Sequence, residues 1–321
     1  MEKDSVSCLV TGAAGFIGSH LSERLLSLGY CVIGIDSFMD YYPRAVKEKN
    51  LLQLKNHPRF SFVEGNLLHF DIGPYLSRVK YVFHQAAQAG VRASWGSSFA
   101  VYTENNINAT QSLLEACKNL PHIEKFIYAS SSSVYGDTPL LPTQEDAPLH
   151  PVSPYGVTKL AAEHLCYLYW KNFGIPTVSL RYFTVFGPRQ RPDMAIHRFI
   201  RSTLRGEPIK VYGDGEQTRD FTFVSDAVEA NILAMKYPRS GEVFNIGGGS
   251  RITVNKLIEL IQTLLNKSVE VQYLRTEKGD VGHTYADTSR AKRELGFSPR
   301  MGIQEGLWEE IQWMKDQLFQ D

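Results

Sequence analysis

The sequence predicts an α/β protein built on a doubly wound parallel sheet, with a smaller, discontinuous α/β lobe beside it. Three observations carry this prediction. The first half of the 321-residue chain alternates short apolar runs with segments of helical periodicity. A glycine-rich turn follows the first apolar run, and an acidic residue ends the second. Continuous apolar strands that alternate with helices are typical of a parallel sheet covered on both faces.

The elements of this sheet are expected from local composition and spacing. Apolar runs predict strands at residues 6–10, 31–35, 60–63, 81–84, 126–129 and 178–181. Helical periodicity predicts helices at residues 16–28, 108–119 and 155–173. In the first helix Ile17, Leu21, Leu25 and Leu28 share one face, and Gly29 ends the helix. The helix at 155–173 is apolar or aromatic on two faces, so one face covers the sheet and the other can meet a symmetry partner.

The second half of the chain has a different texture. Helices are expected at residues 195–205, 226–236, 254–265 and 303–319, with strands at 209–212, 242–246 and 269–273. We expect a dinucleotide-binding domain at 1–185 that includes a return segment at about 220–249, and a smaller lobe at 186–219 and 250–321. Ligands of such sheets bind outside the carboxyl ends of the strands, here in the crevice between the lobes.

Composition excludes several classes of protein. With 43% hydrophobic residues the chain can bury a sizeable core, and 34 basic residues balance 34 acidic ones, so nothing favours binding to nucleic acid or to a membrane surface. The first ten residues lack the apolar region of a signal peptide, and no stretch approaches a membrane span. Four dispersed cysteines predict a reducing, cytoplasmic location. The histidines form no metal-binding pattern, so no metal is expected, and the charged run at 47–49 is expected to be solvated.

The turn after the first strand reads TGAAGFIG, with Gly12, Gly15 and Gly18 at GxxGxxG spacing. Glycines there allow a tight turn, close approach of a pyrophosphate and close helix–strand packing, which are features of a Rossmann-type fold. The N-terminus of the following helix offers free N–H groups to phosphates. Asp36 ends the second strand, where a carboxylate accepts hydrogen bonds from ribose hydroxyls and repels a 2′-phosphate. NAD is therefore favoured over NADP, with a plain glycine-rich turn and a plain loop aspartate as the alternatives.

A second motif, YGVTK, opens the helix at 155–173. Tyr155 and Lys159 share a helical face, and a neighbouring cation favours the phenolate, so this tyrosine can act as a base. Four serines, residues 130–133, directly follow the strand at 126–129 and face the same crevice. One of them can hold a substrate hydroxyl against the tyrosine, while others can belong to a polar turn.

In this order the glycine motif, Asp36, the serine turn and YGVTK resemble the extended short-chain dehydrogenase/reductase family of nucleotide-sugar epimerases, over almost the whole chain. Residues 84–87 (HQAA), 102–110, 181–183 (RYF) and 219–222 (RDFT) resemble further motifs of that family. The resemblance implies that Ser131 and Tyr155 are the catalytic hydroxyls, that Lys159 supports Tyr155, and that the protein is a homodimer. It also implies a set of NAD-binding residues: Gly12, Gly15, Phe16, Ile17, Gly18, Asp36, Asn66, Leu67, Gln85, Ala86, Ala87, Asn106, Ser130, Tyr155, Lys159 and Tyr182.

Shorter strings resemble the UDP-glucuronate 4-epimerases within the family. They are DSFMDYY at 36–42, AQAGVR at 87–92, ASSSSVYG at 129–136 and RPDM at 191–194. The resemblance implies that a sugar carboxylate is bound by hydroxyl and guanidinium donors: Ser132, Ser133, Thr184 and Arg191. A solvated loop arginine is the alternative for Arg191. Arg219 is expected at the diphosphate, and Asp280 at a family turn in which Glu277 replaces a frequent arginine.

The expected function is NAD-dependent 4-epimerisation of UDP-glucuronate to UDP-galacturonate through a transient 4-keto intermediate. The alternatives are a 4-epimerase of UDP-glucose or UDP-N-acetylglucosamine, a UDP-glucuronate decarboxylase, and a non-enzymatic NAD-binding scaffold. By resemblance, related decarboxylases carry a glutamate at the position of Ser133, and related dehydratases carry an Asp-Glu pair at Ser132 and Ser133. Because neither acid is present, decarboxylation and elimination are disfavoured.

Overall fold

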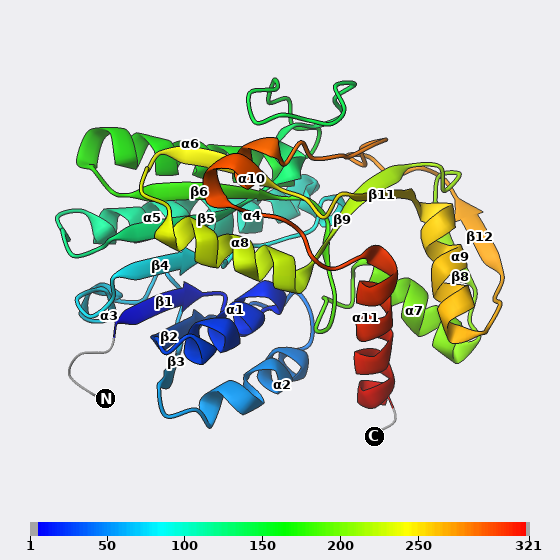
Figure 1. Cartoon of the computed structure of the whole chain (residues 1–321), viewed down its shortest axis with the longest axis horizontal. Coiled ribbons are helices and arrows are strands. Elements are labelled where there is room, and N and C mark those ends of the chain that lie inside the picture. The colour runs from blue at the N-terminus through cyan, green and yellow to red at the C-terminus, as the bar shows by residue number, and fades with distance from the viewer. Residues whose placement is uncertain (1–5, 319–321) are drawn as a thin grey trace.

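The structure is a computed structural model that describes residues 6–318, and its centre is a seven-stranded sheet in the order β10-β6-β5-β4-β1-β2-β3 (Figure 1). Every neighbouring pair in this sheet is parallel. Its strands are β1 (Ser7–Thr11), β2 (Cys31–Asp36), β3 (Phe60–Glu64), β4 (Tyr81–His84), β5 (Lys125–Ser131), β6 (Thr177–Tyr182) and β10 (Glu242–Ile246). The order reverses direction beside β1, which confirms the predicted doubly wound sheet.

Helices cover both faces of the sheet, and the alternation of side chains along β1 shows how. Val10 packs into a core shared with α1 (Phe16–Ser27), α2 (Arg44–Lys55) and α8 (Val224–Lys236). Leu9 points to the opposite face, into a core shared with α5 (Ala109–Cys117) and α6 (Pro154–Phe173). Both faces of the strands are therefore apolar, as continuous apolar runs predict.

The smaller lobe lies beyond the carboxyl ends of the strands, at the right of Figure 1. It contains a three-stranded sheet, β11-β9-β7, and a two-stranded sheet, β12-β8. Its elements are β7 (Val185–Phe186), α7 (Ala195–Arg205), β8 (Ile209–Tyr212), β9 (Thr218–Phe223), β11 (Ser250–Thr253), α9 (Val254–Leu265), β12 (Val271–Leu274) and α11 (Ile303–Leu318). The helix predicted at 303–319 is confirmed to residue 318, and Phe319 lies outside the described residues.

Some short or charged elements are absent from the sequence-based prediction. These are α2, α3 (Gly73–Leu76), α4 (Phe99–Tyr102), α10 (Ser289–Leu295), β7, β9, β11, a π-helical turn (Thr103–Asn108) and 3-10 turns at Arg92–Ser94, Gly96–Ser98 and Ser132–Val134. The helix predicted at 108–119 begins one residue later and ends at Cys117. The strand predicted at 269–273 begins at Val271.

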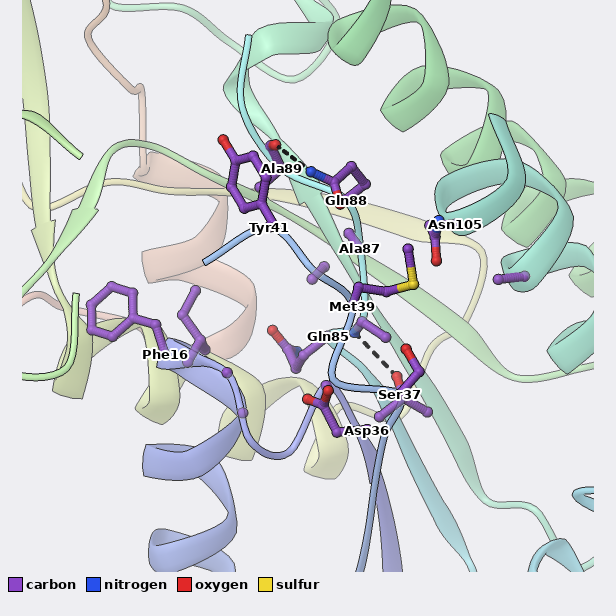
Figure 2. Close-up of a pocket in the computed structure, with 18 of the residues that line it drawn as sticks. Phe16, Asp36, Ser37, Met39, Tyr41, Gln85, Ala87, Gln88, Ala89 and Asn105 are labelled. Atoms are coloured by element: carbon purple, nitrogen blue, oxygen red, sulfur yellow. Dashed lines mark hydrogen bonds between the residues drawn. The ribbon is translucent and has the colours of Figure 1, made fainter. Parts of the chain in front are cut away.

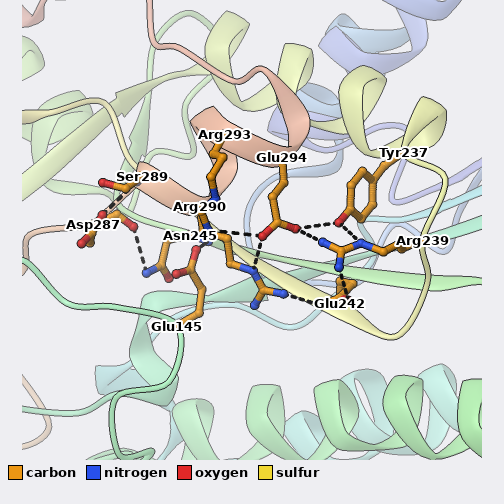
Figure 3. Close-up of polar contacts among 10 residues, drawn as sticks. All are labelled: Glu145, Tyr237, Arg239, Glu242, Asn245, Asp287, Ser289, Arg290, Arg293 and Glu294. Atoms are coloured by element: carbon orange, nitrogen blue, oxygen red, sulfur yellow. Dashed lines mark hydrogen bonds and ion pairs between the residues drawn. The ribbon is translucent and has the colours of Figure 1, made fainter.

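A polar cluster joins α10 to β10 and to the end of α8 (Figure 3). Glu294 on α10 accepts a hydrogen bond from Tyr237 Oη (2.7 Å) and pairs with Arg239, while Arg290 pairs with Glu242 at the start of β10. The helix α10 therefore lies against the edge of the seven-stranded sheet, although residues 250–321 were assigned to the smaller lobe. The division into lobes at 185, 219 and 249 stays a prediction.

The helix α6 presents two different faces, as expected. Its first turn is capped by Ser153, whose Oγ accepts from Gly156 N at 3.1 Å. Lys159 and Cys166 are buried against the sheet, whereas Tyr167 and Leu168 are exposed. Within residues 6–318 no helix, α6 included, combines the length and apolarity needed to cross a bilayer.

Candidate functional site

Two adjoining cavities lie at the carboxyl ends of the parallel strands. The first, which we call the sheet cavity, lies over the ends of β1, β2 and β4 and over the start of α1 (Figure 2). The second, the lobe cavity, lies between the end of β5 and the smaller lobe. The two cavities share part of their walls: Phe16, Ile17, Tyr41, Ala89, Ser130, Tyr155, Tyr182 and Arg191.

The structure brings the predicted site residues together with one exception. The sheet cavity collects the residues expected to bind NAD, apart from Asn106: Gly12, Gly15, Phe16, Ile17, Gly18, Asp36, Asn66, Leu67, Gln85, Ala86, Ala87, Ser130, Tyr155, Lys159 and Tyr182. The lobe cavity collects Ser131 and the residues expected to bind the substrate: Ser132, Ser133, Thr184, Arg191, Arg219 and Asp280.

Asn106 lies behind the sheet cavity and is buried. Its side-chain oxygen accepts from Gln88 N (2.8 Å), and its Nδ2 donates to Gln88 O (3.0 Å) and to Thr158 Oγ1 (2.9 Å). These bonds tie the segment after β4 to α6, and Asn106 is not among the residues that line the sheet cavity. Its neighbour Asn105 lines the cavity instead.

The glycine turn brings the N-terminus of α1 to the floor of the sheet cavity. Gly12 has a φ of +70°, and a Cβ there would lie 2.8 Å from Ala86 N. A Cβ at Gly18 would lie 2.1 Å from Gly12 O. Among the described residues no side chain caps α1, whose N-cap is Gly15. The first turn of α1 therefore offers its N–H groups to an anion, which fits the pyrophosphate of a dinucleotide.

Asp36 is held by the turns around it. Ala14 N donates to its Oδ2 at 3.1 Å, and Phe38 N donates to its Oδ1 at 2.9 Å. Burial raises the pKa of this carboxyl, and the two N–H donors and the charge of Lys47 oppose that rise. Lys47 lines the cavity and donates to Met39 O at 2.7 Å, so the expectation of a solvated run at 47–49 is wrong for this residue.

Tyr155 and Ser131 meet where the two cavities join. Ser131 hydrogen-bonds to the Tyr155 side chain, and its Oγ also accepts from Ser133 N at 3.1 Å. Burial raises the pKa of Tyr155, while the bond from Ser131 and the positive charge of Arg191 lower it. The sequence predicts this electrostatic effect for Lys159, and the structure adds Arg191 as a cation whose charge lowers the pKa of Tyr155.

Lys159 is buried beneath the cavity, with its Nζ 4.4 Å from the centre of the Tyr128 ring. Burial lowers the pKa of Lys159 to about 7, and the nearby Cys166 and Glu163 act in the opposite direction. The amine therefore lies near its midpoint at neutral pH, and it can hold or release a proton within the site.

Arg181 and Glu163 form a buried ion pair behind the serine turn. Their closest atoms, Nη2 and Oε1, lie 2.6 Å apart, and Ser130 Oγ donates to Glu163 Oε2 at 2.5 Å. Arg181 also donates to Tyr135 Oη at 2.7 Å. Arg181, the arginine of the RYF motif, thus holds the end of β5 through Glu163 and Tyr135. It does not line either cavity.

Tyr182, the next residue of the same motif, lies in both cavity walls. Asn231 Nδ2 donates to its hydroxyl at 2.7 Å, and Gln85 lies within hydrogen-bond distance of the same hydroxyl. Burial raises the pKa of Tyr182 to about 12, so the phenol stays protonated at neutral pH. Its hydroxyl, held by Asn231, is a polar group in the same cavity walls as Tyr155.

Arg191 enters the lobe cavity from the loop before α7. Its Nε and Nη2 each donate to one oxygen of Asp193 at 3.0 Å. Only 20% of its side chain is exposed, so Arg191 is not the solvated loop arginine of the alternative interpretation. The hydroxyl residues Ser132, Ser133 and Thr184 line the same cavity.

Sequence reasoning gave no role to Arg92, which also lines the lobe cavity. Arg92 pairs with Asp280 at 2.7 Å and lies 4.0 Å from the centre of the Tyr212 ring. Arg219 lines the same wall and donates to Thr218 O at 2.9 Å. Arg92 thus supplies a cation beside Asp280. Asp280 lies on the turn in which Glu277 stands where related sequences often have an arginine. The sequence signal that could have indicated Arg92 is the AQAGVR string, which ends at this residue.

Comparison with known proteins extends these observations. The model of the NAD dependent epimerase/dehydratase family matches residues 8–247. YtcB of Bacillus subtilis, named as an uncharacterized UDP-glucose epimerase, is 46% identical over 95% of this chain and 97% of its own. A UDP-glucuronate 4-epimerase of Thermodesulfobacterium geofontis is 40% identical over 97% of this chain and 96% of its own. The solved UDP-glucuronic acid 4-epimerase of Bacillus cereus, in complex with UDP-glucuronic acid and NAD, superposes with a TM-score of 0.95 and 45% identity over 97% of this chain and 100% of its own.

Proposed function

Since this chain belongs to the NAD-dependent epimerase/dehydratase family, we propose that it is a 4-epimerase that interconverts UDP-glucuronate and UDP-galacturonate. One observation carries the choice of substrate. Arg191 extends into the lobe cavity close enough to lower the pKa of Tyr155, and the hydroxyl residues Ser132, Ser133 and Thr184 line the same cavity. A guanidinium flanked by hydroxyls is the donor set that a sugar carboxylate requires. The names of the Thermodesulfobacterium and Bacillus cereus relatives support this choice.

The sheet cavity fits NAD by the chemistry of its donors and acceptors. The uncapped N-terminus of α1 is placed for the pyrophosphate, and the carboxylate of Asp36 for the adenosine ribose. Lys159, Tyr155 and Tyr182 line the part of the cavity that adjoins the substrate. When bound there, NAD⁺ supplies a hydride acceptor that returns its hydride within the same turnover.

The residues of the chain then handle the proton and the orientation. Tyr155 takes the proton of the sugar 4-hydroxyl, and Ser131 holds that hydroxyl against it. The resulting 4-keto sugar turns about its link to UDP and presents its other face before Tyr155 returns the proton. Arg191 keeps the carboxylate bound throughout. At Ser132 and Ser133 no acid or base is available to promote loss of CO₂.

A 4-epimerase of UDP-glucose is the second candidate, and the name of the Bacillus subtilis relative favours it. A neutral sugar would leave the guanidinium of Arg191 without a substrate partner. Arg191 would then keep its pair with Asp193 and gain no charge-assisted hydrogen bond from the sugar, so we expect UDP-glucose to bind less tightly than UDP-glucuronate. The two candidates are thus separated by substrate preference alone.

The test is to incubate the purified protein with UDP-glucuronate, without added cofactor, and to follow the products by proton NMR and mass spectrometry. We expect a new anomeric signal at unchanged mass. The variant Tyr155→Phe should lose about 10²–10⁴-fold in turnover while it still binds NAD and UDP-glucuronate. Full turnover by this variant would contradict the role of Tyr155. Release of CO₂ would indicate a decarboxylase, and turnover of UDP-glucose alone would favour the second candidate.

We further propose that the enzyme is a cytoplasmic homodimer. Val157, Tyr167 and Leu168 on α6 are exposed apolar or aromatic residues on the helix face that turns away from the sheet. A face of this kind is typical of a helix that packs against a second copy. The cysteines Cys8, Cys117 and Cys166 are buried thiols, which suits a reducing compartment.

A further inference from the structure

The charge of Arg191 is held by two residues to which the sequence gave no role, Asp193 and Tyr41. Asp193 accepts from Nε and Nη2 of Arg191, so it occupies one edge of the guanidinium in a bidentate pair. Within residues 6–318 no acceptor bonds Nη1. The guanidinium is planar and carries five donors, so its second edge stays available for another carboxylate.

Tyr41 holds Asp193 from the other side. Its hydroxyl donates to Asp193 Oδ2 at 3.2 Å, and its ring centre lies 5.7 Å from the Arg191 guanidinium carbon. The Tyr41 hydroxyl also packs closely on Gly90, where an added Cβ would lie 2.2 Å from the hydroxyl oxygen. In Figure 2 the Tyr41 ring lies beside Ala89, a residue that lines both cavities.

These contacts join three segments that are distant in the sequence. Tyr41 comes from the segment after β2, Gly90 from the segment after β4, and Asp193 from the loop before α7. All of Tyr41, Asp193 and Arg191 line the lobe cavity. An arginine side chain has several rotatable bonds, and holding it in one orientation before the ligand arrives reduces the entropy lost on binding.

We propose that Asp193 and Tyr41 are positioning residues for carboxylate recognition. They fix Arg191 by its Nε edge so that its Nη1 edge faces the sugar, and the preference for a uronic acid over a neutral sugar depends on this relay from Tyr41 to Asp193 to Arg191. The inference rests on the proposed function. It adds two residues that need not touch the substrate and that act through Arg191.

The test compares the dissociation constants of UDP-glucuronate and UDP-glucose, which differ by the carboxylate, for NAD-loaded wild-type protein and variants. Asp193→Ala should weaken UDP-glucuronate binding about tenfold or more and change UDP-glucose binding by less than about threefold. Tyr41→Phe should act in the same direction more weakly, since it removes one hydrogen bond to Asp193. Asp193→Asn, which keeps one acceptor, should lie between Asp193→Ala and the wild type.

A double variant shows whether the effect passes through Arg191. In an Arg191→Ala background, Asp193→Ala should not change the ratio of the two dissociation constants any further. NAD content and thermal unfolding of each variant serve as folding controls. Equal weakening of both ligands by Asp193→Ala would indicate a purely structural role and overturn the inference. Tighter binding of UDP-glucuronate would also overturn it, because Asp193 would then compete with the substrate.

The same measurements separate the inference from the proposed function. If wild-type protein binds UDP-glucuronate no better than UDP-glucose, the proposed substrate and the inference both fail. If wild-type protein prefers UDP-glucuronate and Arg191→Ala removes the preference, but Asp193→Ala leaves it intact, the proposed function stands and the inference alone fails.

Discussion

Individual residues of this site derive their chemistry from burial more than from their identity. Lys159 is only 3% exposed and lies over an aromatic ring, so its ammonium loses hydration that no hydrogen bond in the described chain replaces. Burial raises the pKa of both Tyr155 and Tyr182, and different neighbours oppose that rise. Ser131 and the charge of Arg191 act on Tyr155, whereas Asn231 and Gln85 act on Tyr182 through hydrogen bonds.

The pKa of Lys159 predicts how stability depends on pH. Burial lowers this pKa from 10.5 to about 7, so the unfolded chain binds the proton more tightly than the folded protein does. The resulting destabilisation is complete below pH 7 and is relieved as pH rises from 7 to about 10. Lys159→Met should therefore stabilise the NAD-free protein more at pH 6 than at pH 9, by about 2 kcal/mol. Urea unfolding of both proteins at the two pH values measures this, and a difference independent of pH would contradict it.

Among the elements, strands of the main sheet such as β1, β4 and β10 were the most predictable. Each contains a run of apolar residues, and its bounds follow from composition within a residue or so. The helix α2 was missed because its sequence, RAVKEKNLLQLK, is rich in charge and buries few side chains. The helix α10 was missed because it is short and is held by the ion pairs of Figure 3, which join residues about fifty positions apart.

The site was predictable to the extent that its residues are neighbours in the sequence. The spacing of Gly12, Gly15 and Gly18 and that of Tyr155 and Lys159 fix local geometry, so the sequence alone places these groups. Other groups, among them Tyr41 and Asp193, come from loops whose meeting depends on tertiary packing. Asn106 is a case in which the motif identified the position but not the direction of the side chain. The side chain points into the protein and bonds the Gln88 backbone, and it does not line the cavity.

The close packing of α1 on the glycine turn leads to a prediction about stability. Gly18→Ala would place a methyl group 2.1 Å from Gly12 O, which is backbone and cannot move aside cheaply. We expect a loss of about 1–3 kcal/mol in the unfolding free energy of the NAD-free protein. Gly15→Ala is the matched control, because its Cβ would lie 3.1 Å from the same oxygen at an ordinary φ of −77°, and it should cost no more than about 1 kcal/mol. If both variants lost the same small unfolding free energy, the contact between Gly18 and Gly12 O would not restrict the residue at position 18.

In the molecule as a whole, the loop that carries Arg191 is attached to both parts of the chain. Gly187 N donates to the buried Glu310 of α11 at 2.8 Å. Pro188 O accepts from His20 of α1 at 2.9 Å, and Arg189 pairs with Glu23 of the same helix at 2.7 Å. The helices α1 and α11 therefore together fix the start of the loop that carries Arg191.

The exposed face of α6 gives a prediction about assembly. Leu168 is 50% exposed on this helix, and a charge placed there should prevent a second copy from packing against it. Leu168→Lys should yield a single-chain mass in light scattering, where the wild type yields twice that mass. Leu52→Lys is the control: Leu52 is 62% exposed on α2, on the opposite face of the sheet, and the change should leave the dimer intact. A wild-type protein with the mass of one chain would contradict the proposed homodimer.

The site combines residues held by the sheet and a packed helix with residues held by a loop, and this difference affects how the protein can change by mutation. Tyr155, Lys159 and Ser131 are placed by a buried strand end and a packed helix, where most substitutions disturb the core. Arg191 and Asp193 belong to a loop, and loops tolerate changes in sequence and length far better than sheets do. We therefore expect changes in the loop at 189–194 to be tolerated better than changes at the strand end and the helix that hold Ser131, Tyr155 and Lys159.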